Sequence, residues 1–245
     1  MSTTRTAAIL ATAATAVAAL LTTSAAAPPS ASTSPARTNP DPKAFEHPQQ
    51  NPFYPLTPGL VTYLRGTDGR EHFKQTVRIT TRTRTIAGVE ATVVRDVVRR
   101  PDGSLAEATD DWYAADQDGN VWYFGEDTAT YDENGHLEDR EGSWEAGVDG
   151  AVAGIIMPAD PRPSKAAYME FEKGEAEDQA WVVQRLPSVG TPGGTYDHVV
   201  RTLEWSRLEP DVVSMKFYAR GLGIVEENDI AAGDEHFWVV AFSGG

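Results

Sequence analysis

The chain has 245 residues, of which 40% are hydrophobic, a proportion that suits one large globular domain or two small ones. It contains no cysteine, which excludes thiol nucleophiles, disulfides, cysteinyl metal sites and the lipid-attachment residue of a bacterial lipoprotein. With 36 acidic and 21 basic side chains, the formal net charge at pH 7 is −15. Such a charge repels phosphate and excludes nucleic acid as a partner, whereas cations and neutral ligands remain.

The first 27 residues have the pattern of a secretory signal peptide. Arg5 precedes an apolar run over 7–21, and small residues follow at 24–27. A membrane anchor is the alternative, but this run is shorter than the ~20 residues that span a bilayer. We therefore expect cleavage near Ala27 and a secreted mature protein that has no membrane span.

Residues 28–50 are rich in Pro, Ser, Thr and Ala, and Phe45 is their only large aromatic residue. Such a segment buries too little surface to offset the entropy of ordering it, so we expect a flexible linker. The remaining residues, 51–245, are expected to form a single β-rich domain.

Apolar and polar residues alternate along 72–79, 198–205 and 213–217, the period of half-buried strands. Asp-Gly and Asn-Gly pairs such as those at 118–119 and 134–135 indicate tight hairpin turns between the strands. We predict an all-β fold, an antiparallel meander of about ten strands that forms a barrel, a half-barrel or a two-layer sandwich. Residues 236–242 are apolar on both faces and should form a central strand. The only helix predicted in this domain is a short one near 174–180.

The charges are distributed unevenly along the chain. Residues 60–100 contain nine basic and four acidic side chains, whereas residues 102–149 contain fifteen acidic side chains and one basic, Arg140. We expect basic and acidic strands to lie side by side and to pair across the sheet. The carboxylates left over either face solvent or share a cation.

A calcium loop is one interpretation of the acidic residues near the 118–119 turn. Asp116, Asp118 and Asn120 carry oxygen ligands at positions i, i+2 and i+4, and Asp149 is a further candidate ligand for Ca²⁺. An EF-hand is excluded, because its sixth and twelfth positions would be Val121 and Asp127. An ordinary hairpin turn explains the same residues without any metal.

The same hairpin concentrates aromatic residues. With a two-residue turn at 118–119, Ala115 lies opposite Trp122 and Tyr113 lies opposite Phe124, so that both faces are apolar. The hairpin is then either sandwiched inside the protein or lines a cleft with one face. For the second case, the candidate ligand-binding residues, suited to a carbohydrate, are Trp112, Trp122, Trp144, Glu126 and Glu145.

Two motifs resemble a family of exported bacterial proteins of uncharacterised function: DWYAADQDGNVWYFGED at 111–127 and GSWEAGVDG at 142–150. Further matching segments lie at 51–59, 154–158, 174–178, 208–213 and 216–225, whereas 162–167 departs from the pattern. The resemblance implies export and a β-sheet fold, and it brings no active site with it.

Three hypotheses about function follow. The preferred one is a secreted, non-catalytic binding protein with an acidic, aromatic-lined surface for a divalent cation or a neutral carbohydrate. A secreted hydrolase of extracellular polymer would use a carboxylate pair drawn from Glu126, Glu145, Asp149 and Glu175. An envelope scaffold without a small ligand would have no deep pocket. The sequence indicates no particular oligomeric state.

Overall fold

The computed structural model describes residues 38–244. The expected signal peptide and the first part of the expected linker, 28–37, lie outside the described residues. A short 3-10 helix, η1 (Pro42–Phe45), comes first. The strands of the first half are β1 (Val61–Asp68), β2 (Glu71–Ile86), β3 (Val89–Arg99), β4 (Leu105–Ala115), β5 (Val121–Asp127), β6 (Trp144–Glu145) and β7 (Val152–Met157). Those of the second half are β8 (Ala167–Tyr168), β9 (Glu170–Phe171), β10 (Asp178–Thr191), β11 (Gly194–Ser206), β12 (Val213–Ala219), β13 (Gly223–Ala231) and β14 (Glu235–Ser243).

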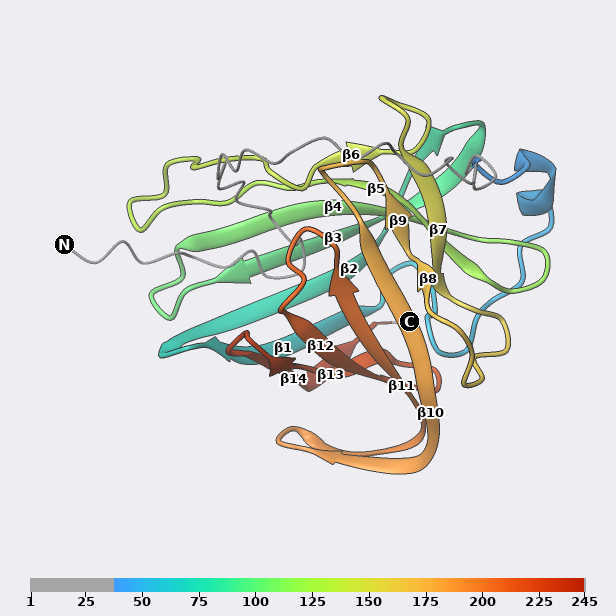
Figure 1. The fold of residues 1–245 in the computed structure, drawn as a ribbon. Coiled ribbons are helices and arrows are strands. Elements are labelled where there is room, and N and C mark those ends of the chain that lie inside the picture. The colour runs from blue at the N-terminus through green and yellow to red at the C-terminus, as the bar shows by residue number, and fades with distance from the viewer. Residues whose placement is uncertain (1–37, 245) are drawn as a thin grey trace, which may run out of the picture.

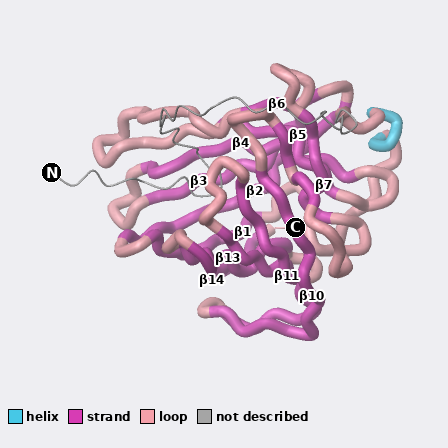
Figure 2. The backbone as a smooth tube through the Cα atoms, in the orientation of Figure 1, coloured by secondary structure: helices cyan, strands magenta, loops and turns pink. Residues whose placement is uncertain are grey.

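These 14 strands form one antiparallel sheet that curls into a nearly closed barrel (Figures 1 and 2). Neighbours in the sheet follow chain order from β1 to β5 and from β10 to β14, and β14 pairs with β1. The two ends of the sheet, β8 and β9, are also adjacent in sequence, which brings these ends together. The predicted all-β antiparallel meander is confirmed. The strands outnumber the expected ten partly because β6, β8 and β9 contain two residues each.

Strand β14 is central, as its two apolar faces predict, because it pairs with β1 on one side and β13 on the other. The short helix predicted over 174–180 is wrong. Glu172 and Ala176 form a bridge around a turn, which the Glu177 carboxylate closes by accepting the Gly174 N–H at 3.1 Å. Strand β10 then begins at Asp178. Over residues 38–244, no helix is long and apolar enough to span a membrane.

The β4–β5 hairpin forms with a register one residue away from the predicted one. Ala115 pairs with Val121 and Tyr113 with Tyr123, because the loop contains three residues, 117–119, rather than two. The Asp116 N–H donates to the Asn120 carbonyl at 2.9 Å, and this pair closes the loop. Gly119 has φ +88°, the left-handed conformation that a three-residue hairpin loop requires.

The part of the expected linker that the structure describes lies against the outside of this hairpin. The Phe45 ring meets Trp122 and Phe124 edge to face, with centroids 6.2 and 5.5 Å away. The Ala44 carbonyl accepts the Gln117 N–H at 2.7 Å, and Asn39 Oδ1 accepts the Ala153 N–H at 2.8 Å. Residues 39–45 thus cover the outer face of β5.

The next segment, residues 51–60, closes one end of the barrel. The Pro52 carbonyl accepts the Gly221 N–H, and Gly59 donates to the Ile79 carbonyl at 2.8 Å. Asn51 is buried and donates from Nδ2 to the carbonyls of Gly119 and Pro158 at 2.8 and 2.9 Å. This segment therefore covers one end of the barrel, the end at which β1 begins.

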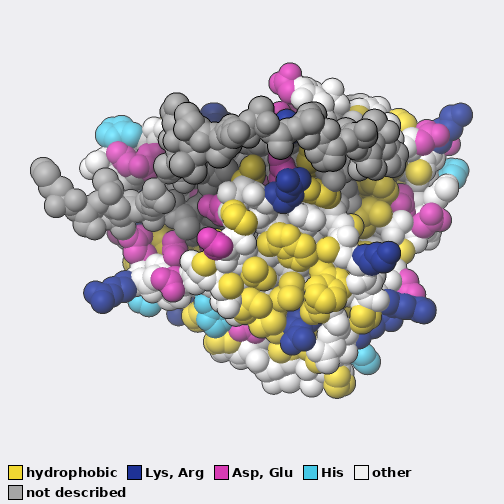
Figure 3. Space-filling model, in the orientation of Figure 1, with side chains coloured by type: hydrophobic (Ala, Val, Ile, Leu, Met, Phe, Trp, Pro, Cys, Tyr) yellow, Lys and Arg dark blue, Asp and Glu magenta, His cyan; other side chains and the backbone are white. Residues whose placement is uncertain are grey.

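Strands β11 and β12 turn their polar residues inward. Thr202, Glu204 and Ser206 are buried, whereas the alternating residues Leu203 and Trp205 are only half-buried. Across the sheet, Leu203 pairs with Trp181 on β10, which is 40% exposed, and with Met215 on β12. Hydrophobic side chains accordingly gather on the surface over β10 (Figure 3). The polar groups of these strands are left to line the interior.

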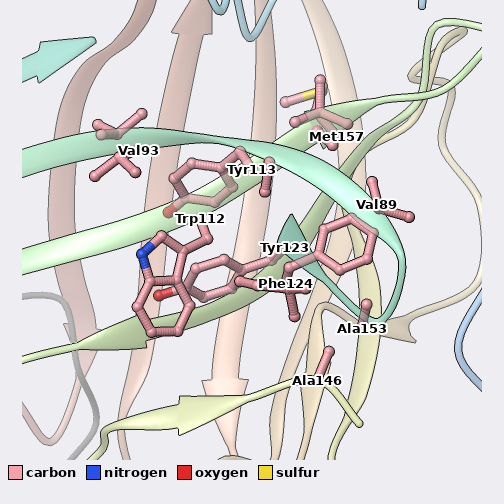
Figure 4. Close-up of a cluster of buried hydrophobic side chains, with 14 of the residues drawn as sticks. Val89, Val93, Trp112, Tyr113, Tyr123, Phe124, Ala146, Ala153 and Met157 are labelled. Atoms are coloured by element: carbon pink, nitrogen blue, oxygen red, sulfur yellow. The ribbon is translucent and has the colours of Figure 1, made fainter. Parts of the chain in front are cut away.

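Aromatic rings form the largest hydrophobic cluster, which lies around β3, β4, β5 and β7 (Figure 4). Tyr113 and Tyr123 stack with their centroids 4.7 Å apart, and Trp144 meets Tyr123 edge to face at 5.3 Å. Trp112 and Phe124 are also buried. The hairpin is thus covered on its outer side, and its two tyrosines face the interior of the barrel.

Candidate functional site

The Asp116 loop has the geometry of a hairpin turn. Asp116 Oδ1 accepts the N–H groups of Asp118 and Asn120, both at 2.9 Å. Its Oδ2 accepts Asn120 Nδ2 and Trp122 Nε1, both at 2.8 Å. Burial alone would raise the pKa of Asp116, but these donors outweigh it and lower the pKa.

The other predicted calcium ligands are not gathered around this carboxylate. Asn120 Oδ1 accepts the Ala159 N–H at 2.9 Å, Asp118 is exposed, and Asp149 is exposed in a turn of its own with φ +48°. Among the residues that the structure describes, no three His, Asp or Glu side chains are placed to hold a metal ion.

The five predicted ligand-binding residues are divided between the outside and the inside of the sheet. Trp112 lies beneath the Arg84 guanidinium, 4.2 Å from the ring centroid, and Arg84 also pairs with Glu145. Trp122 is half-buried and bonded to Asp116, and Trp144 is buried against Tyr123. Only Glu126 lines the interior. Of the carboxylates considered for a hydrolase, Glu145, Asp149 and Glu175 likewise lie elsewhere.

On the outer face, acidic and basic strands pair as expected. Asp110 of β4 accepts hydrogen bonds from Arg82 of β2 at 3.0 Å and from Arg95 of β3 at 3.3 Å, and Glu145 of β6 pairs with Arg84 of β2. These pairs are partly exposed and contribute about 0–1 kcal/mol each. Many other carboxylates have no part in these outer pairs and point into the barrel.

These carboxylates line a cavity of about 420 Å³ inside the barrel. Its walls carry thirteen acidic residues and a single basic one, Lys216. The acidic residues come from strands around the barrel and from the turns and loops at its open end: Asp68, Asp96, Glu107, Asp111, Glu126, Glu170, Asp178, Glu204, Glu209, Glu227, Asp229, Asp234 and Glu235. Of these thirteen, only Glu126 is among the ligand-binding residues predicted from the sequence.

Lys216 lies between two carboxylates. Its Nζ is 3.0 Å from Glu204 Oε2 and 3.1 Å from Glu227 Oε1. Glu204 Oε1 accepts the hydroxyls of Thr202 at 2.7 Å and Tyr218 at 3.0 Å. Burial opposes the ammonium, but Glu204 and Glu227 outweigh it and raise the pKa of Lys216 well above its usual value. The single positive charge is therefore already neutralised by the protein.

Asp96 has an oxygen that faces the cavity without a partner. Its Oδ2 accepts Gln75 Nε2 at 2.7 Å, but Oδ1 is buried and has no hydrogen bond among the described residues. The Asp96 residue is only 6% exposed. Burial, followed by the charges of Asp111 and Glu107, raises the pKa of Asp96 well above its usual value. An ionised Asp96 thus lacks a compensating charge.

Asp111 is held by tyrosines near the covered end of the barrel. Its Oδ1 accepts the Tyr123 hydroxyl at 2.8 Å and the Tyr113 hydroxyl at 3.3 Å. Burial raises the pKa of Asp111 to about 6, although these two hydroxyls act in the opposite direction. The Tyr54 ring lies 5.2 Å from Tyr113 and adds a further aromatic surface.

Burial also raises the pKa values of five other cavity carboxyls, those of Glu126, Glu170, Glu209, Glu227 and Glu235. The nearby acids strengthen the effect: Asp111 and Glu170 act on Glu126, Asp178 acts on Glu170, and Glu227 acts on Glu235. For Glu227, Lys216 opposes burial but does not cancel it. The cavity therefore favours any species that adds positive charge.

The two ends of the cavity differ in polarity. The covered end, which we call the floor, is lined by aliphatic side chains from the 51–60 segment and adjacent strands: Leu56, Leu60, Ile79, Val94, Ile156, Leu222 and Ile224. The opposite end, the mouth, carries Asp68, Glu209, Asp234 and Glu235. The strand register sets this direction, because β1 begins beside the floor and ends at Asp68, which pairs with Glu235.

Comparisons with known proteins add only distant similarities. No protein-family model matches the sequence, and no curated protein does. A crystal structure of a predicted lipoprotein from Parabacteroides distasonis ATCC 8503 is 12% identical, with a TM-score of 0.43 over 80% of this chain and 100% of that one. A predicted exported protein with a YmcC-like fold, from Bacteroides fragilis NCTC 9343, is 12% identical, with a TM-score of 0.45 over 79% and 99%. TM-scores below 0.5 assign neither a family nor a function to this chain.

Proposed function

We propose that this protein is an exported, non-catalytic binding protein that holds a small, positively charged molecule inside its barrel. The signal-peptide pattern of residues 1–27 supports export. The observation that carries the binding function is the cavity of about 420 Å³, whose thirteen acidic residues face one lysine that is already paired. This volume lies within the roughly 300–1,000 Å³ typical of small-molecule sites.

The charge of the cavity selects the ligand. A cation inside it offsets the repulsion and desolvation that raise the pKa values of the carboxyls around it. A neutral carbohydrate would leave that cost in place, and an anion would increase it. A cation is therefore the preferred ligand, and the site is the interior of the barrel rather than the Asp116 loop.

A thermal-shift panel tests this function. The purified protein is melted with cationic, neutral and anionic molecules of similar size, among them spermidine, phenethylamine, Ca²⁺, maltose and citrate. Ligands that bind the folded state raise the melting temperature by mass action, so we expect a rise with at least one cation and none with maltose or citrate. A rise with maltose, or no rise with any cation, contradicts the proposal.

A further inference from the structure

We infer that the cation is an amphiphilic amine, which enters the barrel with its apolar body first and leaves its ammonium group beside Asp96. This inference rests on the proposed function and names the chemical class of its ligand. It draws on the two ends of the cavity and on the free oxygen of Asp96, which are independent observations.

The floor provides the place for the apolar body. Ile79 and Val94 pair across β2 and β3 at the level of the floor, where Leu60 also accepts the Ile79 N–H at 3.0 Å. Tyr54 and Tyr113 add ring faces on which an aromatic or alkyl group can pack. A bare metal ion or a short hydrophilic cation would leave this apolar surface without a contact.

Asp96 fixes where the positive charge lies. It is two residues beyond Val94 on β3, on the same inward face, which places it roughly 7 Å from the floor along the strand. Its buried Oδ1 is an acceptor without a donor, and an ammonium N–H supplies one. An amine whose nitrogen is joined to an aromatic ring by two methylene groups can place its ring on the floor and its nitrogen beside Asp96.

Lys216 opposes the reverse orientation, in which the ammonium of the ligand would lie near the floor. Its own ammonium lies between Glu204 and Glu227, with side-chain exposures of 13%, 6% and 10%, and its charge acts on Tyr54 and Asp111 near the covered end. Anionic groups on the ligand would meet the remaining carboxylates of the wall. The site therefore accepts a monocation with a neutral body and rejects amino acids, whose carboxylate would lie near the Asp96 side chain.

Matched ligands distinguish the contribution of the apolar body to affinity from the contribution of the positive charge. We would measure the affinities of tryptamine, of its neutral analogue tryptophol, of methylammonium, of spermidine and of Ca²⁺ by calorimetry on the purified protein. We expect tryptamine to bind about 10- to 100-fold more tightly than tryptophol, the range of one charge-assisted hydrogen bond. Methylammonium and Ca²⁺ should bind more weakly than tryptamine because they lack the body.

Asp96→Asn tests the position of the charge. The variant keeps an acceptor for Gln75 and removes a buried carboxyl, so the fold should be retained. It should reduce the affinity for tryptamine about tenfold or more and change that for tryptophol less than about twofold. The control is Asp118→Asn, which removes one exposed carboxylate outside the cavity and should change neither affinity.

The outcomes distinguish this inference from the proposed function. If spermidine or Ca²⁺ binds more tightly than tryptamine, the cavity holds a cation but the amphiphilic amine is overturned. Equal binding of tryptamine and tryptophol, or an unchanged tryptamine affinity in Asp96→Asn, overturns the role of Asp96. If none of these cations binds, both the inference and the proposed function fail.

Discussion

Asp116 shows how a motif with metal-ligand spacing can be used for a turn. Its two oxygens accept four hydrogen bonds from residues 118, 120 and 122, two on each oxygen. Loss of this carboxylate would leave four partly buried N–H donors without their acceptor. The role of Asp116 in this structure is therefore to fix the three-residue loop and the register of the β4–β5 hairpin.

Asp116→Ala should lower the free energy of unfolding by about 2–4 kcal/mol, because several donors lose a charged acceptor at once. The measurement is urea denaturation at pH 7 in the presence and absence of 10 mM Ca²⁺. Asp118→Ala is the control, and its exposed side chain should contribute less than about 0.5 kcal/mol. If calcium stabilised the parent chain and not Asp116→Ala, the loop would be a metal site after all.

Asp110 and Asp111 are neighbours that face opposite sides of the sheet. Asp110 pairs with Arg82 and Arg95 on the outside, whereas Asp111 lines the cavity, where burial raises its pKa from 3.8 to about 6. Between these two pH values the folded state binds a proton that the unfolded state releases. The contribution of Asp111 to stability therefore decreases as the pH rises from about 4 through 6.

Asp111→Asn should raise the free energy of unfolding at pH 7 by about 1–3 kcal/mol, since the amide carries no charge and still accepts a tyrosine hydroxyl. The gain should vanish near pH 4, where the carboxyl is neutral in the parent chain. Denaturation at both pH values measures this, and Asp110→Asn should show no gain at either. Stabilisation that is equal at pH 4 and pH 7 would contradict the assigned pKa shift.

At the scale of the strands, closure of the barrel depends on a glycine of β7. A Cβ atom built on Gly154 would lie 2.4 Å from the Tyr168 carbonyl oxygen and 2.5 Å from the Met169 carbonyl carbon. These are backbone atoms, so they move only if the short strands β8 and β9 move. Gly154 thus permits the close approach by which the two ends of the sheet meet.

Gly154→Ala should destabilise the protein by about 2–3 kcal/mol, the range of overpacking in a tightly packed site. The matched control is Gly190→Ala on β10, where no atom lies within 4 Å of the added Cβ and the backbone is not left-handed. Thermal unfolding measures both variants. A melting temperature of Gly154→Ala equal to that of Gly190→Ala would show that closure does not depend on this contact.

The elements were predictable from the sequence to the extent that local patterns determine them. Alternation and turn residues predict strands such as β14, whose apolar faces indicate its central position. They do not determine the hairpin register, because the Asp116 carboxylate selects a three-residue loop over the two-residue turn that Asp-Gly favours. The turn at 174 was mistaken for a helix because acidic residues suit both a helix N-terminus and a turn that a carboxylate closes.

The site was harder to predict because alternation does not say which face is inside. In 198–205 and 213–217 we expected the apolar residues to face the core, whereas Glu204 and Lys216 face the interior and Leu203 faces outward. The fifteen acidic residues of 102–149 led us to predict a site at the β4–β5 hairpin. The cavity takes only three of its thirteen acids from that stretch, Glu107, Asp111 and Glu126. The other ten come from β1, β3, β9, β10, β11, β13 and β14 and from the turns between them.

For the whole molecule, two sets of carboxyls with opposite shifts determine the pH of maximum stability. Burial raises the pKa values of cavity groups such as Asp96, Glu126 and Glu235, so their contribution to stability decreases as the pH rises above about 4. Hydrogen bonds from the backbone lower the pKa of Asp132 to about 2, and its contribution is lost as the pH falls toward that value. The two trends meet at mildly acidic pH.

The ligand-free protein should therefore melt at its highest temperature near pH 4–5, and its melting temperature should fall by several degrees between pH 5 and pH 8. Repulsion among surface charges, with a net charge of −15, predicts a fall of the same sign, but salt screens it. Salt does not screen the desolvation of buried carboxyls, so the fall in melting temperature should persist in 0.5 M NaCl. It should become smaller in Asp96→Asn and remain unchanged in Asp118→Asn. Calorimetric scans across this pH range measure all four curves, and a melting temperature that rises from pH 5 to pH 8 would show that the cavity carboxyls are not the groups that set the stability.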